Sequence, residues 1–221
     1  MTNFDLWKLV NFITGKDIYS KRLSGPQMEL ELQSKNISLL RKRLGFPEAY
    51  QQGQPPVAID SIRLTQTDLK PFYVEKNINV SQDGIALIPE YFYIEDFYTA
   101  ESLAPEIISR AEISNRIRDV QTKPTVKYPV AYIISKGLQV YPVNIGSIHV
   151  IYIRKPVEPK FSIKTNTTTL EYEYDVQNSV ELEWDDMGKL DILQMILSEF
   201  GLSIERNDIV NIAKQVIKTG D

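Results

Sequence analysis

Apolar residues recur at helical spacing in the first 45 residues of the chain, and their pattern predicts two helices. One covers residues 3–14, where the apolar positions lie three or four residues apart, as on one face of a helix. The other covers residues 24–45, where Pro26 suits the first turn and Gly45 marks the end. The apolar stripe of this second helix consists of Met28, Leu32, Leu39, Leu40 and Leu44.

Short apolar and alternating segments dominate the chain from residue 57 to residue 154, and they predict β-strands. The first four segments are separated by short turns, which favours a meander. A helix is expected next, over residues 105–119, with Pro105 in its first turn. Three more strands with short connections follow it. The expected strands cover residues 57–66, 71–80, 84–89, 91–99, 130–135, 137–143 and 147–154.

The last third of the chain begins with a polar stretch at residues 162–169. Residues 171–186 then alternate with a period of two, which predicts a β-hairpin that turns near residues 177–179. Apolar stripes predict two helices after the hairpin, over residues 187–201 and 203–220. These two helices would pack either on their own chain or on a neighbouring molecule.

The best candidate for a domain boundary is the segment at residues 47–56, which is polar and rich in residues that break regular structure. We therefore expect an N-terminal helical region over residues 1–54 and an α+β core domain over residues 55–221. The expected fold class is α+β, with N-terminal helices, a central antiparallel β-sheet or sandwich, one inserted helix and two C-terminal helices.

Composition argues against several classes of function. The 221 residues carry a formal net charge of −4, whereas proteins that bind duplex DNA normally present a basic surface. The chain has no cysteine and one histidine, and it contains no glycine-rich phosphate loop, so thiol chemistry, HExxH metal sites and nucleotide loops are not expected. No stretch approaches the roughly 18 apolar residues of a membrane span, and the first residues do not resemble a secretory signal. We expect no cofactor, no metal and no membrane partner.

The single histidine, His149, lies inside the strand expected over residues 147–154. A serine–histidine–aspartate triad would have to use this residue. Its position within a strand, rather than on a loop at a strand end, favours a packed or surface residue over a base. Both faces of the strand are apolar: Ile148, Val150 and Tyr152 lie on one face, and Ile151 and Ile153 lie on the other.

A second candidate for chemistry is a group of carboxylates surrounded by aromatic residues. Glu90, Glu95 and Asp96 lie within the sequence PEYFYIEDFY, a composition that resembles a carbohydrate-binding cleft with paired acids. The same sequence also fits a strand that is aromatic on both faces, as in a sandwich core or an interface. Carbohydrate chemistry is therefore kept as an alternative, and no catalytic residue is assigned.

Residues 165–188 contain no lysine or arginine, and their acids alternate along the predicted hairpin. If its two strands pair, six carboxylates gather on one surface, which like-charge repulsion disfavours. A basic partner, a surface that faces DNA without holding it, or simple solvation would each account for this surface. A bound calcium ion is disfavoured, because alternating strand acids do not supply the clustered loop ligands that calcium prefers. The acids are Glu171, Glu173 and Asp175 on one strand and Glu181, Glu183 and Asp185 on the other.

Cations and prolines alternate in two other segments, which suggests extended arms, because proline favours extended backbone and cannot complete a β-ladder. One arm contains Arg154, Lys155 and Lys160 and leads to Phe161; the other contains Lys123 and Lys127. A basic arm and an acidic hairpin on one molecule suggest self-association, in which the arm of one copy meets the acidic face of the next. Such a heterologous contact can repeat and close into a ring. The candidate subunit-interface or channel-facing residues are the six acids together with Arg154, Lys155, Lys160 and Phe161.

Several stretches, taken in order, resemble structural proteins of crAss-like bacteriophages of Bacteroidetes hosts, in particular the neck or tail ring proteins. The stretches are LRKRLGFPEAYQQGQP (40–55), TDLKPFYV (67–74), GIALIPEYFY (84–93), KYPVAYIISKGLQVYPVNIGSIHVIYIRKPVEPKF (127–161), SVELEWDD (179–186) and LSEFGLSIERNDIVNIAKQ (197–215).

This resemblance implies a virion protein that acts as a head-to-tail connector and is assembled in the cytoplasm of the bacterial host. Proteins of this kind form a ring of many copies, typically twelve, around the channel through which the genome passes. The implied partners are other copies of the chain, the portal protein and neighbouring tail or ring proteins, with genomic DNA passing through without specific binding. Another multimeric virion protein, such as a tail hub or minor capsid component, is the alternative. The resemblance carries no catalytic residue over to this chain.

Overall fold

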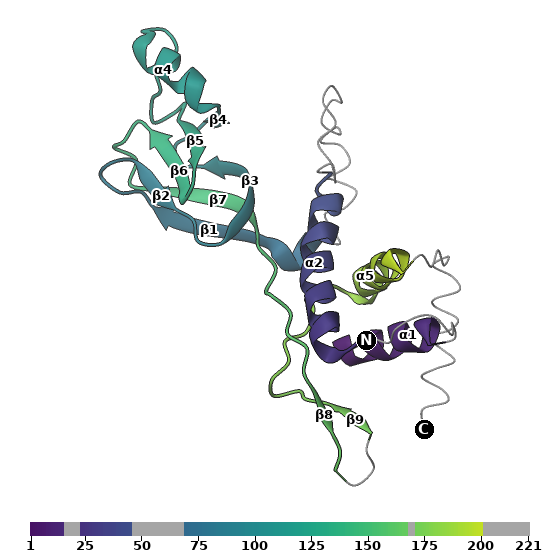
Figure 1. Cartoon of the computed structure of the whole chain (residues 1–221). Coiled ribbons are helices and arrows are strands. Elements are labelled where there is room, and N and C mark those ends of the chain that lie inside the picture. Colours follow the sequence, from purple (N-terminus) through teal and green to yellow (C-terminus); the bar gives the residue numbers. More distant parts are fainter. Residues whose placement is uncertain (16–22, 46–68, 168–170, 201–221) are drawn as a thin grey trace. The chain divides into compact units, whose positions relative to one another are not determined.

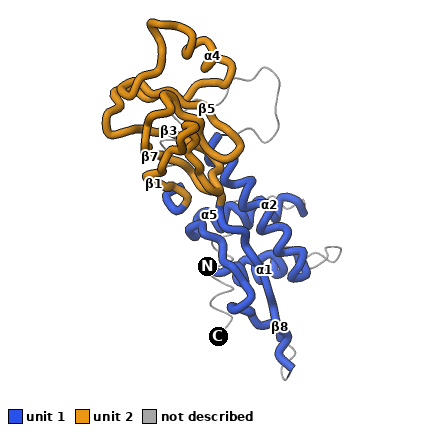
Figure 2. Tube along the Cα trace, turned by 90° about the vertical axis from the view of Figure 1, so that its left-hand side faces the viewer, with its two compact units in different colours: residues 1–71, 156–221 blue, residues 72–155 orange. Residues whose placement is uncertain are grey.

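The computed structural model describes residues 1–15, 23–45, 69–167 and 171–200, and it confirms the predicted α+β class. The chain divides into two compact units, coloured separately in Figure 2. Unit 1 comprises residues 1–71 and 156–221, and unit 2 comprises residues 72–155. The boundary expected at residues 47–56 and the strand expected at residues 57–66 lie outside the described residues, so the division at residue 54 stays a prediction.

Unit 1 contains three described helices: α1 (Asn3–Thr14), α2 (Gly25–Arg43) and α5 (Asp186–Glu199) (Figure 1). Each begins where the side chain of the preceding residue can satisfy free backbone N–H groups. Thr2 and Ser24 form capping boxes, and Asp185 accepts a hydrogen bond of 2.7 Å from the backbone N–H of Gly188. The helices predicted at residues 3–14, 24–45 and 187–201 are thus confirmed to within two residues, and the one predicted at residues 203–220 lies outside the described part of the chain. None of the described helices is long and apolar enough to cross a bilayer.

Two short strands of unit 1 form an antiparallel pair, β8 (Ile163–Thr165) with β9 (Tyr172–Tyr174). The hairpin predicted over residues 171–186 is therefore wrong, because β9 pairs with the polar segment before it and not with residues 180–185. Charge favours this choice of partner. In the observed register Lys164 lies opposite Glu173, whereas the predicted hairpin would have gathered like charges.

Unit 2 consists mainly of two small sheets (Figure 1). The sheet of order β1-β7-β3 is antiparallel, and the sheet of order β2-β6-β5-β4 ends in one parallel pair. The predicted meander is wrong, because β1 pairs with the distant β7 rather than with its sequence neighbours. A strand with apolar side chains on both faces suits the central position, and β7 is that strand. The strands are β1 (Tyr73–Asn79), β2 (Ile85–Leu87), β3 (Tyr91–Tyr98), β4 (Glu106–Ile107), β5 (Val130–Ile134), β6 (Gly137–Tyr141) and β7 (Ser147–Arg154), and a 3-10 turn, η1 (Lys70–Phe72), precedes β1.

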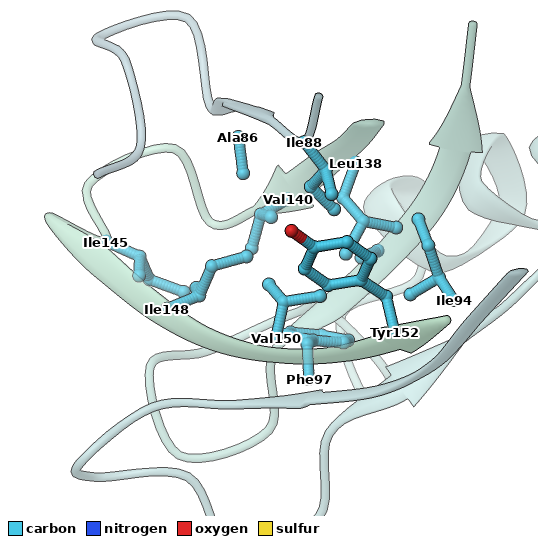
Figure 3. Packing of buried hydrophobic residues seen from close by; sticks show 11 residues of the cluster. Ala86, Ile88, Ile94, Phe97, Leu138, Val140, Ile145, Ile148, Val150 and Tyr152 are labelled. Carbon is cyan, nitrogen blue, oxygen red and sulfur yellow. The ribbon is translucent and has the colours of Figure 1, made fainter. Parts of the chain in front are cut away.

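Apolar side chains from both sheets meet in one core, shown in Figure 3. Val150 and Tyr152 of β7 lie against Leu138 and Val140 of β6, as expected for one apolar face of β7. The buried residues of this core are Ala86, Ile88, Ile94, Phe97, Ala131, Leu138, Val140, Ile145, Ile148, Val150 and Tyr152.

The strand β3 departs from the simple alternation that its sequence suggests. Its register against β7 shifts between Ile94 and Asp96, where Glu95 has no partner of its own. A β-bulge of this kind inserts one extra residue and breaks the period of two. Ile94 and Phe97, three residues apart, can therefore both enter the core.

The helix predicted at residues 105–119 is shorter than expected, since α4 spans Arg110–Arg118. Ser109 sets its start, because this residue and Glu112 form a capping box. The residues before it form β4, which pairs in parallel with β5. The apolar Ile107 thus belongs to a sheet edge and not to the first turn of a helix.

Candidate interaction surfaces

The proline-guided segment that follows β7 lies along α2 within unit 1. Asn36 donates a side-chain hydrogen bond of 3.2 Å to the carbonyl of Val157, and Gln33 donates one of 3.2 Å to the carbonyl of Pro159. The backbone N–H of Phe161 donates to a carboxylate oxygen of Glu29 at 3.0 Å. The segment is extended, as predicted, but side chains of its own chain hold it in place.

The same segment also contacts the acidic residues that follow the β8–β9 pair. The N–H of Val157 donates to Glu183 at 2.9 Å, and Lys160 and Val180 exchange two backbone hydrogen bonds of 3.1 and 2.9 Å. The basic arm and the acidic segment therefore meet within one chain. Their meeting between two copies stays a prediction.

The six predicted acids do not form one acidic surface, because most of them serve separate local contacts in unit 1. Glu181 accepts a 2.8 Å hydrogen bond from the N–H of Asn3, Glu183 accepts one from Val157, and Asp185 caps α5. Glu173 accepts a 2.6 Å hydrogen bond from Asn166, while Glu171 is exposed. The structure thus shows these acids in separate hydrogen bonds that stabilise the folded chain, and not as one group of like charges.

Asp175 is the most enclosed of these acids, with 3% of its surface exposed. Lys164 Nζ lies 2.8 Å from its Oδ1 atom, and Asn178 donates to its Oδ2 atom at 2.7 Å. The lysine contact acts as an ion pair rather than a well-aligned hydrogen bond, since Oδ1 has no hydrogen-bond partner of good geometry. Lys164 and then Asn178 hold the pKa of Asp175 below its ordinary value.

Replacing Asp175 with asparagine is expected to destabilise unit 1 at neutral pH and to matter less in acid. Because its folded pKa is lowered, the Asp175 contribution is fully present above the unfolded pKa of about 3.9 and is lost as the pH falls through the folded pKa. Urea unfolding followed by tryptophan fluorescence at several pH values measures this, because Trp7 and Trp184, the only tryptophans, both lie in unit 1. Glu171→Gln, at an exposed position of the same segment, is the matched control. A difference between wild type and Asp175→Asn that stays constant from pH 7 to below the folded pKa would contradict the assignment.

Phe161, predicted to face a neighbour or the channel, lies inside unit 1 with 4% of its surface exposed. Its ring packs 6.0 Å from the ring of Trp7 and 6.1 Å from that of Tyr174. Burial, and next the hydrogen bond to Glu181, raise the pKa of Tyr174 to about 12. Phe161 therefore anchors the arm to its own unit.

The two cations before this segment are placed differently from Phe161. The guanidinium of Arg154 lies 5.7 Å from the centre of the Phe72 ring, a distance typical of a cation–π contact. The backbone N–H of Lys155 donates to the carbonyl of Glu90 at 2.8 Å, while its side chain is exposed. Among the residues of this predicted arm, Lys155 and the equally exposed Lys160 are accessible to a partner.

His149 packs against a neighbouring aromatic ring on the face of its sheet opposite the core. The rings of His149 and Tyr98 are stacked at 5.0 Å with an angle of 6° between their planes. Within the described part of the chain, His149 Nδ1 is buried without a hydrogen-bond partner, so no aspartate orients the ring as a triad requires. The hydroxyl of Tyr98 donates to Glu75 at 2.6 Å. The packing interpretation of His149 fits these contacts.

The carboxylates near the aromatic strand occupy two different places in the backbone, one in a turn and two on β3. Glu90 occupies a tight turn with a φ of 53°, before β3 begins. Glu95 and Asp96 are exposed on β3, and Asp96 accepts a 2.8 Å hydrogen bond from the N–H of Phe97. Burial, and next the charge of Asp96, raise the pKa of Glu95. Across residues 1–15, 23–45, 69–167 and 171–200, no three histidine or acidic side chains are grouped to hold a metal ion.

Sequence reasoning missed one surface, the end of unit 2 that carries α4. The sequence predicts an arm at Lys123 and Lys127 of this end, but it does not predict the exposed apolar residues near them. Val120 is 91% exposed and Leu103 is 69% exposed, and the backbone N–H of Leu103 donates to the carbonyl of Lys127 at 2.8 Å. No periodic pattern marks these residues, so the surface emerges only from the fold.

No protein-family model matches this chain, and no curated protein matches its sequence.

Proposed function

We propose that this protein is a virion structural protein, a ring-forming head-to-tail connector or neck adaptor of a tailed phage. The observation that carries the proposal is the exposure of large apolar side chains on both units. Exposed apolar side chains of this size are candidate contacts with other proteins. The most exposed of these side chains are Val120, Val176, Leu103, Leu30, Leu87 and Tyr172.

Charge supports a protein that surrounds DNA without holding it. The net charge of −4 gives the chain as a whole little attraction for phosphate. Many of its acids serve caps and local hydrogen bonds, as in Glu183 and Asp185. DNA would pass such a ring without being retained by it.

The proposed partners follow from the sequence resemblance. They are other copies of the chain, typically twelve, together with the portal protein and the neighbouring tail or ring proteins. The protein would act in the neck or tail of the virion after assembly in the host cytoplasm. The exposed Lys155 and the exposed α4 end of unit 2 are surfaces that such neighbours would cover.

Negative-stain electron microscopy of the purified chain, alone and with portal protein, tests this function. The proposal predicts ring-shaped particles with cyclic symmetry and an open centre. A tail hub or minor capsid component would instead give particles without an open ring. Loss of activity on a carbohydrate substrate in Glu95→Gln, with the fold retained, would favour the enzyme alternative and contradict the proposal.

A further inference from the structure

The α4 end of unit 2, defined as residues 101–128, carries five cations and four acids, and three of these acids are used in local contacts while Glu101 is exposed. Glu106 is paired with Arg116 at 2.7 Å. Glu112 accepts a 3.0 Å hydrogen bond from the N–H of Ser109 at the start of α4. Asp119 accepts from the N–H of Gln121 at 3.0 Å and from the hydroxyl of Thr122 at 2.8 Å.

Four exposed cations of the α4 end make no ion pair within the described part of the chain. They are Arg110, Arg118, Lys123 and Lys127. Exposed apolar side chains lie in the same segment, with Val120 directly after α4 and Leu103 beside Lys127. Apolar residues together with cations fit a protein surface that is both apolar and acidic.

The other sheet of unit 2 offers an acidic surface at β3, where Glu95 and Asp96 are exposed. In the described part of the chain β3 is the outermost strand of the β1-β7-β3 sheet, so one of its edges has no partner strand. Glu95 lies at the bulge of this strand beside Asp96, and no described cation pairs with it. Partial burial and the neighbouring Asp96 charge raise the Glu95 pKa.

We propose that the α4 end of one copy docks on the outer edge of β3 in the next copy, with Arg118 and Lys123 facing Glu95. This inference rests on the proposed ring and names the contact that builds it. The two surfaces consist of different residues of unit 2, so the contact is heterologous. A head-to-tail contact of this kind repeats from copy to copy and closes into a ring.

Charge exchange between two full-length variants tests the contact. Variant A carries Glu95→Lys, and variant B carries Arg118→Glu with Lys123→Glu. In either variant alone, every contact places like charges together, and we expect self-association to weaken at least about tenfold. In an equal mixture, copies of A and B can alternate, so that every contact joins opposite charges and assembly returns. Light scattering coupled to size-exclusion chromatography measures all three samples.

The matched controls are Asp83→Lys and Lys136→Glu, which reverse exposed charges on other turns of unit 2. Both should assemble like the wild type. If the wild type assembles and the mixture of A and B does not, or if A and B each assemble like the wild type, the contact is wrong while the ring stands. If the wild-type chain stays monomeric, the ring itself fails and the contact with it. Recovery in the mixture also shows that both variants are folded.

Discussion

Replacing Phe161 with alanine is expected to lower the free energy of unfolding of unit 1 by about 3–5 kcal/mol, the usual cost of removing a buried phenylalanine. The residue is almost fully buried, and its ring contacts Trp7 and Tyr174. Its loss leaves a cavity where the segment after β7 joins α1. The fluorescence of Trp7 and Trp184 during urea unfolding reports this change directly, because both lie in unit 1.

Val176→Ala is the matched control, because this residue of unit 1 is exposed and loses little on truncation. The result also separates two interpretations of Phe161. A buried anchor lowers stability when it is removed. An interface residue would leave the stability of the monomer unchanged and weaken assembly alone, and that outcome would contradict the packing described above.

Replacing Phe97 with alanine is expected to destabilise unit 2 by a similar amount, about 3–5 kcal/mol. Phe97 is fully buried and lies in the core with Val150 and Ile94 (Figure 3). It reaches this core because the bulge at Glu95 shifts the register of β3. Hydrogen-exchange mass spectrometry should show faster exchange in peptides of β3 and β7.

Leu87→Ala, at an exposed position of the neighbouring sheet, is the control and should leave exchange in β7 unchanged. If Phe97→Ala behaves like Leu87→Ala, then β3 continues its simple alternation and the bulge is misplaced. Such a result would also remove Glu95 from the position that the proposed contact between copies requires.

Local features of the fold were well predicted because they depend on residues close together in sequence. The capping residues and apolar stripes locate α1, α2 and α5 to within two residues. Alternation and short turns locate β5, β6 and β7 to within two residues. The apolar face formed by Ile148, Val150 and Tyr152 is confirmed as part of the core.

Pairing and register were not predictable in the same way, because they depend on residues far apart in sequence. β1 pairs with β7 across about seventy residues, a choice that burial of the central strand decides. The acids of residues 171–185 alternate as in a hairpin, but β8 supplies Lys164 opposite Glu173 and captures β9 instead. The alternating pattern of an acidic strand does not show which other strand will supply the cation that offsets its acids.

The candidate surfaces also combine local features that the sequence predicts with long-range contacts that it does not. The sequence identified the cations and the extended backbone after β7, but not that Glu29, Gln33 and Asn36 of α2 bind this segment within one chain. It identified Lys123 and Lys127, but not that the acids around them are used by Arg116 and the caps of α4. Whether a charge is free depends on the contacts of its neighbours, which composition does not contain.

The mass of the assembled species tests the central claim most directly. Light scattering coupled to size-exclusion chromatography should be run on the full chain at low salt, where contacts between exposed charges are strongest, both alone and with portal protein. The account predicts an assembly of many copies, with a mass of about 300 kDa for twelve copies of the 25.4 kDa chain. If this chain elutes at the mass of a single copy in both samples, the account is contradicted.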